Sequence, residues 1–235
     1  MSVVSDTFTR ANETPLASPW TSSIGGAFTA GVTLVSNTAA GVGAVNGLSQ
    51  YSSNTWSLDQ FCEAIVGALA AGTAFAGVCV RLNTTASGYI LQTDGTTTTL
   101  VRYDIGVATN LVTGIGAVAN GDKLAIRVVG PNISCFKNGV LVASATDTNL
   151  KLGNPGILAA GASTLDNFFA NDLGQQVQAV PGGIRTGRGG RILRRLRVPL
   201  QNWPDPAPAA ADDGVYSFED GDWLSAIDDA GDVDT

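Results

Sequence analysis

Six arginines follow one another closely between residues 185 and 197. A cluster of guanidinium groups binds carboxylates or phosphates, because each planar fork offers paired N–H donors. Residues 201–235, directly behind, carry ten acids and no Lys or Arg. The net charge is therefore −3 over 1–180, +6 over 181–200 and −10 over 201–235, which add to −7. The six are Arg185, Arg188, Arg191, Arg194, Arg195 and Arg197.

Nucleic acid and an acidic protein surface are the two partners that fit these arginines. The run 187–191 (GRGGR) resembles neither a P-loop nor a dinucleotide fingerprint. The acidic segment behind the arginines would repel a polyanion. The charge order therefore favours docking on an acidic protein surface over nucleic acid.

The acidic segment also carries large apolar side chains that are suited to anchoring. Prolines at 199, 204, 206 and 208 favour extended chain, and Asp222 is placed to cap a short helical turn. A Gly/Pro/Asp-rich tail of this kind buries too little apolar surface to fold alone. We predict an arm that docks on neighbouring subunits, with the anchors Trp203, Tyr216, Phe218, Trp223 and Ile227 beside the six arginines.

Common catalytic and metal-binding patterns are missing from the sequence. It has no histidine, which excludes Ser-His-Asp and Cys-His catalysis and imidazole metal sites. Cys62, Cys79 and Cys135 lie in apolar runs without a C-x-x-C spacing, so we expect buried, reduced thiols and no zinc. Five aspartates near turns leave a calcium site open, but turn chemistry explains them better: Asp94, Asp104, Asp122, Asp147 and Asp166. No cofactor is expected.

The elements that must position these residues are short strands. Apolar or alternating runs of strand length recur from Val3 to Phe169 with turn signals between them, and none shows a sustained helical period. Asp94-Gly95 and Asn138-Gly139 each predict a β-hairpin. We predict an all-β antiparallel sandwich or jelly roll over 1–173, a basic Gly/Arg-rich arm over 174–200, and a Pro-rich then acidic docking tail over 201–235.

The opening Asp6-Thr7-Phe8-Thr9-Arg10, followed by Pro15-Leu16 and Trp20, resembles the start of concanavalin A-like lectin/glucanase domains found in bacterial and bacteriophage proteins. Later landmarks fit the same pattern over roughly 1–172: Asp59-Gln60-Phe61, Val80-Arg81, Gly88-Tyr89, Gly121-Asp122, Phe136-Lys137-Asn138-Gly139, Thr146-Asp147 and Pro155-Gly156. The resemblance implies a jelly-roll fold that hosts hydrolases, lectins and structural modules alike.

The glucanases of that family resemble one another in a Glu-x-Asp-x-x-Glu strand, which this sequence lacks. Residues 1–180 hold two glutamates, Glu13 and Glu63, neither flanked by a suitable acid. We therefore expect no enzyme. Sugar binding, which the resemblance also implies, would need exposed aromatic side chains, and core packing explains Trp20 and Trp56 equally well.

The sequence shows no Sec signal and no apolar run long enough to span a membrane. We expect an accessory structural protein of a bacteriophage virion, made in the host cytoplasm, as a capsid decoration or cement protein or a tail-associated protein. Its partners would be other virion proteins and further copies of itself. The alternative is a carbohydrate-binding receptor-recognition module of a tail fibre or bacterial surface protein, with a host glycan as ligand.

Overall fold

A computed structural model describes residues 2–22, 24–25, 28, 30–42, 46–69 and 75–174. In these residues the regular elements are all strands, and no helix is long and apolar enough to cross a membrane. The strands are β1 (Val3–Asp6), β2 (Trp20–Thr21), β3 (Thr33–Val35), β4 (Thr38–Ala40), β5 (Asn46–Tyr51), β6 (Gln60–Ala68), β7 (Ala76–Leu82), β8 (Gly88–Thr93), β9 (Thr98–Asp104), β10 (Val107–Val112), β11 (Lys123–Val129), β12 (Asn132–Lys137), β13 (Val140–Thr146), β14 (Asn154–Ala160) and β15 (Thr164–Asp172).

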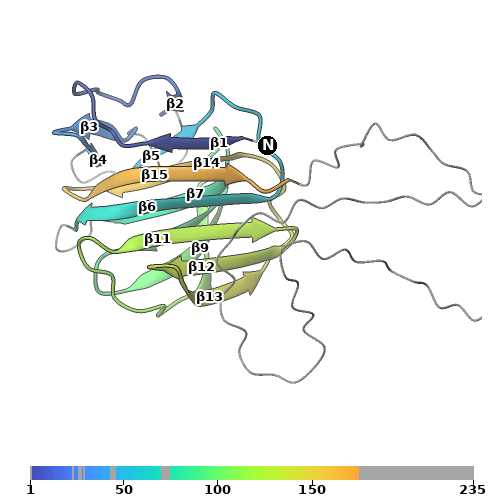
Figure 1. Cartoon of the computed structure of the whole chain (residues 1–235). Coiled ribbons are helices and arrows are strands. Elements are labelled where there is room, and N and C mark those ends of the chain that lie inside the picture. The colour runs from blue at the N-terminus through green and yellow to red at the C-terminus, as the bar shows by residue number, and fades with distance from the viewer. Residues whose placement is uncertain are drawn as a thin grey trace, which may run out of the picture. The chain divides into compact units, whose positions relative to one another are not determined.

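The strands form two antiparallel sheets packed face to face, with β1, β15, β6, β11, β12 and β13 running side by side in Figure 1. One sheet has the order β13-β12-β11-β6-β15-β4-β3, and β1 also pairs with β15. The other has the order β10-β9-β8-β7-β14-β5-β2. The prediction of an all-β antiparallel sandwich is confirmed.

The main core lies between the sheets and follows from alternation along the strands. In β6, the side chains of Cys62, Ala64 and Val66 are buried in this core, whereas Glu63 and Ile65 on the other face are only partly buried. Burying one face of each sheet supplies the hydrophobic free energy that holds the sandwich together. All three cysteines are free and buried, as the sequence predicted.

The opening motif organises one side of this core. The Asp6 carboxylate accepts hydrogen bonds from the Phe8 backbone (2.8 Å), the Trp20 indole (2.7 Å) and the Arg10 guanidinium (2.7 Å). Trp20 packs against Phe168 with ring centroids 4.7 Å apart. The residues of the opening motif that resembles the lectin/glucanase family therefore serve to position Trp20 in the core.

The structure differs from the sequence prediction in several local details. Strands β2, β4 and β10 were not predicted. The sequence favours a first strand over Val3–Phe8, but β1 ends at Asp6, since Phe8 adopts φ = +53°. The Asn138-Gly139 hairpin is confirmed as a two-residue turn with both φ positive (51° and 79°). The Asp94-Gly95 hairpin is also formed, but its loop has four residues, since Thr93 pairs with Thr98.

A second apolar cluster covers the outward face of the seven-stranded sheet. Ile24 and Phe28, from the segment between β2 and β3, pack on it, and Phe28 lies edge-on to Tyr103 with ring centroids 4.8 Å apart. We call it the outer cluster; it comprises Ile24, Phe28, Leu48, Cys79, Leu82, Ala86, Ile90 and Leu158. The centre of this sheet face is thus packed interior rather than an open groove.

Candidate functional site

A polar pocket of about 750 Å³ opens at one end of the sandwich. Three parts of the chain form it: the start of β1, the loop that follows β5, and the end of β15. We call it the end pocket; it is lined by Ser2, Val3, Ser53, Asn54, Thr55, Trp56, Ser57 and Asp172. Its size is in the range of small-ligand sites, which run from about 300 to 1,000 Å³.

The walls of the end pocket are tied to the core and to each other. The Trp56 side chain is buried, its indole N–H donates to the Tyr51 carbonyl (3.2 Å), and its ring lies edge-on to Tyr51. The Ser2 hydroxyl donates to the Thr55 carbonyl (3.2 Å), and the Ser2 carbonyl accepts from the Asp172 backbone (2.8 Å). The β1 and β5 sides of the pocket are therefore held together before any ligand arrives.

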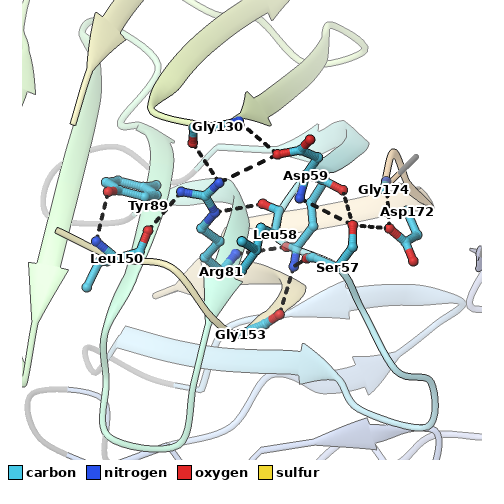
Figure 2. A network of polar contacts seen from close by, with 11 residues as sticks. Ser57, Leu58, Asp59, Arg81, Tyr89, Gly130, Leu150, Gly153, Asp172 and Gly174 are labelled. Atoms are coloured by element: carbon cyan, nitrogen blue, oxygen red, sulfur yellow. Dashed lines mark hydrogen bonds and ion pairs between the residues drawn. The ribbon is translucent and has the colours of Figure 1, made fainter. Parts of the chain in front are cut away.

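Asp172 supplies the one carboxylate among the described lining residues, and Figure 2 shows it beside Ser57 and Gly174. Its Oδ1 accepts a short hydrogen bond from the Ser57 hydroxyl and a second from the Gly174 backbone (2.9 Å). A Cβ at Gly174 would lie 2.4 Å from the Ser57 Cβ, so only glycine fits. The last described residues are thus fixed against the pocket wall.

Behind the pocket, Arg81 joins three loops (Figure 2). Its side chain is 3% exposed and donates to the carbonyls of Leu58 (2.8 Å), Leu150 (2.8 Å) and Gly130 (2.7 Å). Burial lowers the pKa of the guanidinium, with Tyr89 and the Asp59 carboxylate 3.9 Å away acting in the opposite direction. A buried guanidinium that donates to three carbonyls in this way holds the three loops together. We call this arrangement the Arg81 clamp.

Gln60 connects the clamp to the pocket loop. Its buried amide donates to the carbonyls of Ser57 (2.8 Å) and Gly153 (2.7 Å), and its oxygen accepts from the Arg81 backbone (2.9 Å). Each polar group of this side chain has a partner, so the network positions the loop and leaves no group of Gln60 for catalysis.

The three side chains at the tip of the loop are different. Ser53, Asn54 and Thr55 line the pocket, and their side chains make no hydrogen bond to other described residues. They offer two hydroxyls and one amide, which can donate and accept in several directions. The pocket is therefore suited to a neutral ligand rich in hydroxyl groups.

Most carboxylates of the described residues serve the fold. Nine of the ten accept a hydrogen bond from a backbone or side-chain donor, Asp104 being the tenth. Four of the turn aspartates, Asp94, Asp122, Asp147 and Asp166, accept from backbone N–H groups at 2.7–2.8 Å, as turn chemistry predicts. No group of three Cys, Asp or Glu in the described ranges is placed to hold a metal ion.

Some of the residues singled out from the sequence lie in the described part of the chain, and others do not. The eleven predicted docking residues, from Arg185 to Ile227, lie outside the described residues and stay predictions. Trp20 and Trp56 are both buried, which agrees with core packing. The end pocket was not predicted. Its one signal in the sequence is the run of hydroxyl and amide residues around Trp56, which reads equally well as an ordinary polar loop.

No family model and no curated protein matches the sequence. Among solved structures, the chain is similar to the carbohydrate binding module CBM66 from Bacillus subtilis, with 18% identity, a TM-score of 0.53, and coverage of 65% of this chain and 95% of that one. A native glycosidic hydrolase (11%, TM-score 0.50, coverage 74% and 97%) and a prokaryotic beta-1,3-1,4-glucanase (lichenase) derived from a mouse hindgut metagenome (10%, TM-score 0.50, coverage 74% and 100%) are also similar. These similarities show a concanavalin A-like fold.

Proposed function

We propose that residues 2–174 form a non-catalytic carbohydrate-recognition domain that binds its ligand in the end pocket. The observation that carries the proposal is the hydrogen-bonding capacity of Ser53, Asn54 and Thr55 in a pocket whose walls are already fixed. A pre-formed site loses little entropy on binding, so a few hydrogen bonds to sugar hydroxyls suffice. The similarity to a carbohydrate binding module supports the ligand class.

The outer cluster helps to locate the site. Ile24 and Phe28 fill the centre of the outward face of the seven-stranded sheet, so a sugar chain finds no polar groove there. The end pocket instead exposes hydroxyl and amide groups. The ligand therefore binds at the end of the sandwich.

Recognition fits the pocket better than hydrolysis. A glycosidase needs two carboxyl groups about 5–10 Å apart, one of them able to donate a proton. The described lining of the end pocket holds one carboxylate, Asp172, whose Oδ1 is engaged by Ser57 and Gly174. The pocket thus lacks the second group that the reaction requires.

The test is glycan binding by the full chain, first on a glycan array and then by calorimetry with the best glycan. We expect the double variant N54A/T55A to lose at least about tenfold in affinity, since each lost hydrogen bond is worth about 1 kcal/mol. The matched control is T109A on β10, an exposed threonine outside the pocket. An array without any binder, or release of reducing ends from the bound glycan, would contradict the proposal.

A second proposal concerns where this domain acts. The +6 and −10 segments and the eleven docking residues support an arm, 174–235, that attaches the domain to a bacteriophage virion as a capsid decoration or tail-associated protein. Copies of the chain and other virion proteins would hold the arm by charge pairing and by its aromatic anchors. Truncation after residue 180 should abolish incorporation into particles while glycan binding is kept. Normal incorporation of the truncated chain would refute this placement.

A further inference from the structure

Strand β13 forms one edge of the eight-stranded sheet, and its outer side pairs with no strand of the described residues. Its sequence, VLVASAT, contains no charge and no proline. Three consecutive side chains are exposed: Val140 (65%), Leu141 (47%) and Val142 (37%). Soluble proteins usually protect an edge strand with charges, prolines or a covering element, because its free N–H and C=O groups otherwise pair with another chain.

The other edges of the two sheets offer less to a partner. β3 has three residues and β2 has two, and β1, which among the described strands pairs with β15 alone, has four residues and ends at the charged Asp6, so these edges support at most a short ladder. β10 has six residues, but its pairing with β9 is irregular between Asn110 and Val112. β13 has its irregularity in its first half, and Ala143–Thr146 pair in regular register with β12. The second half of β13 is therefore a flat edge ready for a further strand.

The exposed apolar side chains belong to the edge strand itself, because the apolar residues beside Leu141 on β12 and β11 are buried. Leu141 pairs with Phe136 of β12, whose ring is 7% exposed, and Phe136 pairs with Ala125 of β11. On the opposite face, Ala143 and Ala145 pack against the main core. A strand added beside β13 would thus extend the hydrogen-bonded ladder and shield part of the exposed apolar edge strand.

We propose that β13 pairs antiparallel with β13 of a second copy about a twofold axis, so that two eight-stranded sheets become one. A strand without charge can oppose itself without like-charge repulsion. Self-pairing is also closed, because it uses up both free edges. Pairing of β13 with β10 of a neighbour would leave one edge free at each end and propagate into a fibre. This inference is independent of the glycan proposal.

Cysteine cross-linking of the full chain tests the pairing directly. Single cysteines at Ser144 and Thr146 lie on the second half of the strand and one at Val142 lies directly before it, while the three native cysteines are buried. Antiparallel pairing about a twofold axis places a residue opposite its own copy only at the axis, so mild oxidation should convert the variant nearest the axis mostly into a covalent dimer. I105C, at a 74% exposed position in the β9–β10 turn, is the matched control and should stay uncoupled.

The mass in solution provides a second measurement. The wild type should be dimeric, and V142K/S144K should have about half its mass, because charges on opposed edges repel. V107K on β10 should leave the mass unchanged. A monomeric wild type, equal masses for V142K/S144K and wild type, or dissociation by V107K instead would each overturn the proposal. If V142K/S144K fails to fold, the cross-linking test decides by itself, and the absence of a cross-link at all three cysteine positions overturns the proposal.

Discussion

Arg81 illustrates how a single residue fixes the end of the sandwich. It adopts φ = +52°, which breaks the alternation of β7, so that Val80 lies in the main core and Leu82 in the outer cluster. The guanidinium then donates to three carbonyls from three different loops. The loop of the end pocket is among them, since Leu58 follows Ser57 directly.

We predict that R81M lowers the free energy of unfolding by about 3 kcal/mol, because three buried carbonyls lose their donor at once. The control is R127M, which removes a half-buried arginine from β11 and should cost about 0.5 kcal/mol or less. Urea unfolding of both variants measures the difference. A cost for R81M no larger than that for R127M would show that the clamp contributes little.

Asp94 gives a second residue-scale prediction, in pH dependence. Hydrogen bonds from the Thr97 backbone and the Thr96 hydroxyl and backbone lower the pKa of Asp94 to about 2. The pKa of an aspartate in the unfolded chain is about 3.9. Since the pKa is lower in the folded protein, the ionised carboxylate stabilises the fold above a pH of about 3.9, and this contribution is lost as the pH falls towards 2. D94N keeps an oxygen acceptor without a titrating charge. The stability gap between wild type and D94N should shrink between pH 4 and 2; a gap independent of pH would refute this assignment.

At the scale of elements, the close approach of the β13–β14 connection to β7 is set by Gly153. A Cβ at Gly153, which has φ = +144°, would lie 2.2 Å from the carbonyl carbon of Arg81. Both Gly153 and Gln60 therefore hold this connection against the Arg81 backbone.

We predict that G153A destabilises the protein by about 3 kcal/mol or more, since backbone must move to admit the methyl group. G114A is the matched control: Gly114 also has positive φ (+70°), but a Cβ there would meet nothing within 4 Å. It should cost about 1 kcal/mol, the penalty of the left-handed backbone alone. If thermal or urea unfolding shows that G153A and G114A lose the same amount of stability, backbone strain and not the contact with Arg81 determines the effect.

The sequence predicts strands well where an apolar or alternating run of strand length exists, and poorly where neither does. β6 is expected from a continuous apolar run and β11 from alternation, and Asn138-Gly139 forms its turn because both residues tolerate positive φ. β10 was missed because its first four residues are all exposed, which leaves no apolar period. The positive φ of Arg81 depends on tertiary contacts and has no local signal. The end pocket depends on three segments far apart in sequence, which no spacing reveals.

At the scale of the whole molecule, two features determine where a ligand can reach this sandwich. The outer cluster closes the centre of one sheet face, and the end pocket, formed by β1, the loop after β5 and the end of β15, stays open. Self-pairing of β13 would give a particle with two such pockets, and two linked sites bind a multivalent glycan surface more tightly than one. Weak single sites would then be enough for attachment.

The most direct test of the account is an NMR titration of the full chain with the best glycan from the array. Backbone amide shifts should move at Ser53–Ser57, at Ser2 and at Asp172–Gly174, and N54A/T55A should need at least about ten times more glycan for the same changes. The backbone amides of the outer cluster, such as those of Leu48 and Ile90, should stay unchanged. Shifts concentrated on the outer cluster, or none with any bound sugar, would contradict the account.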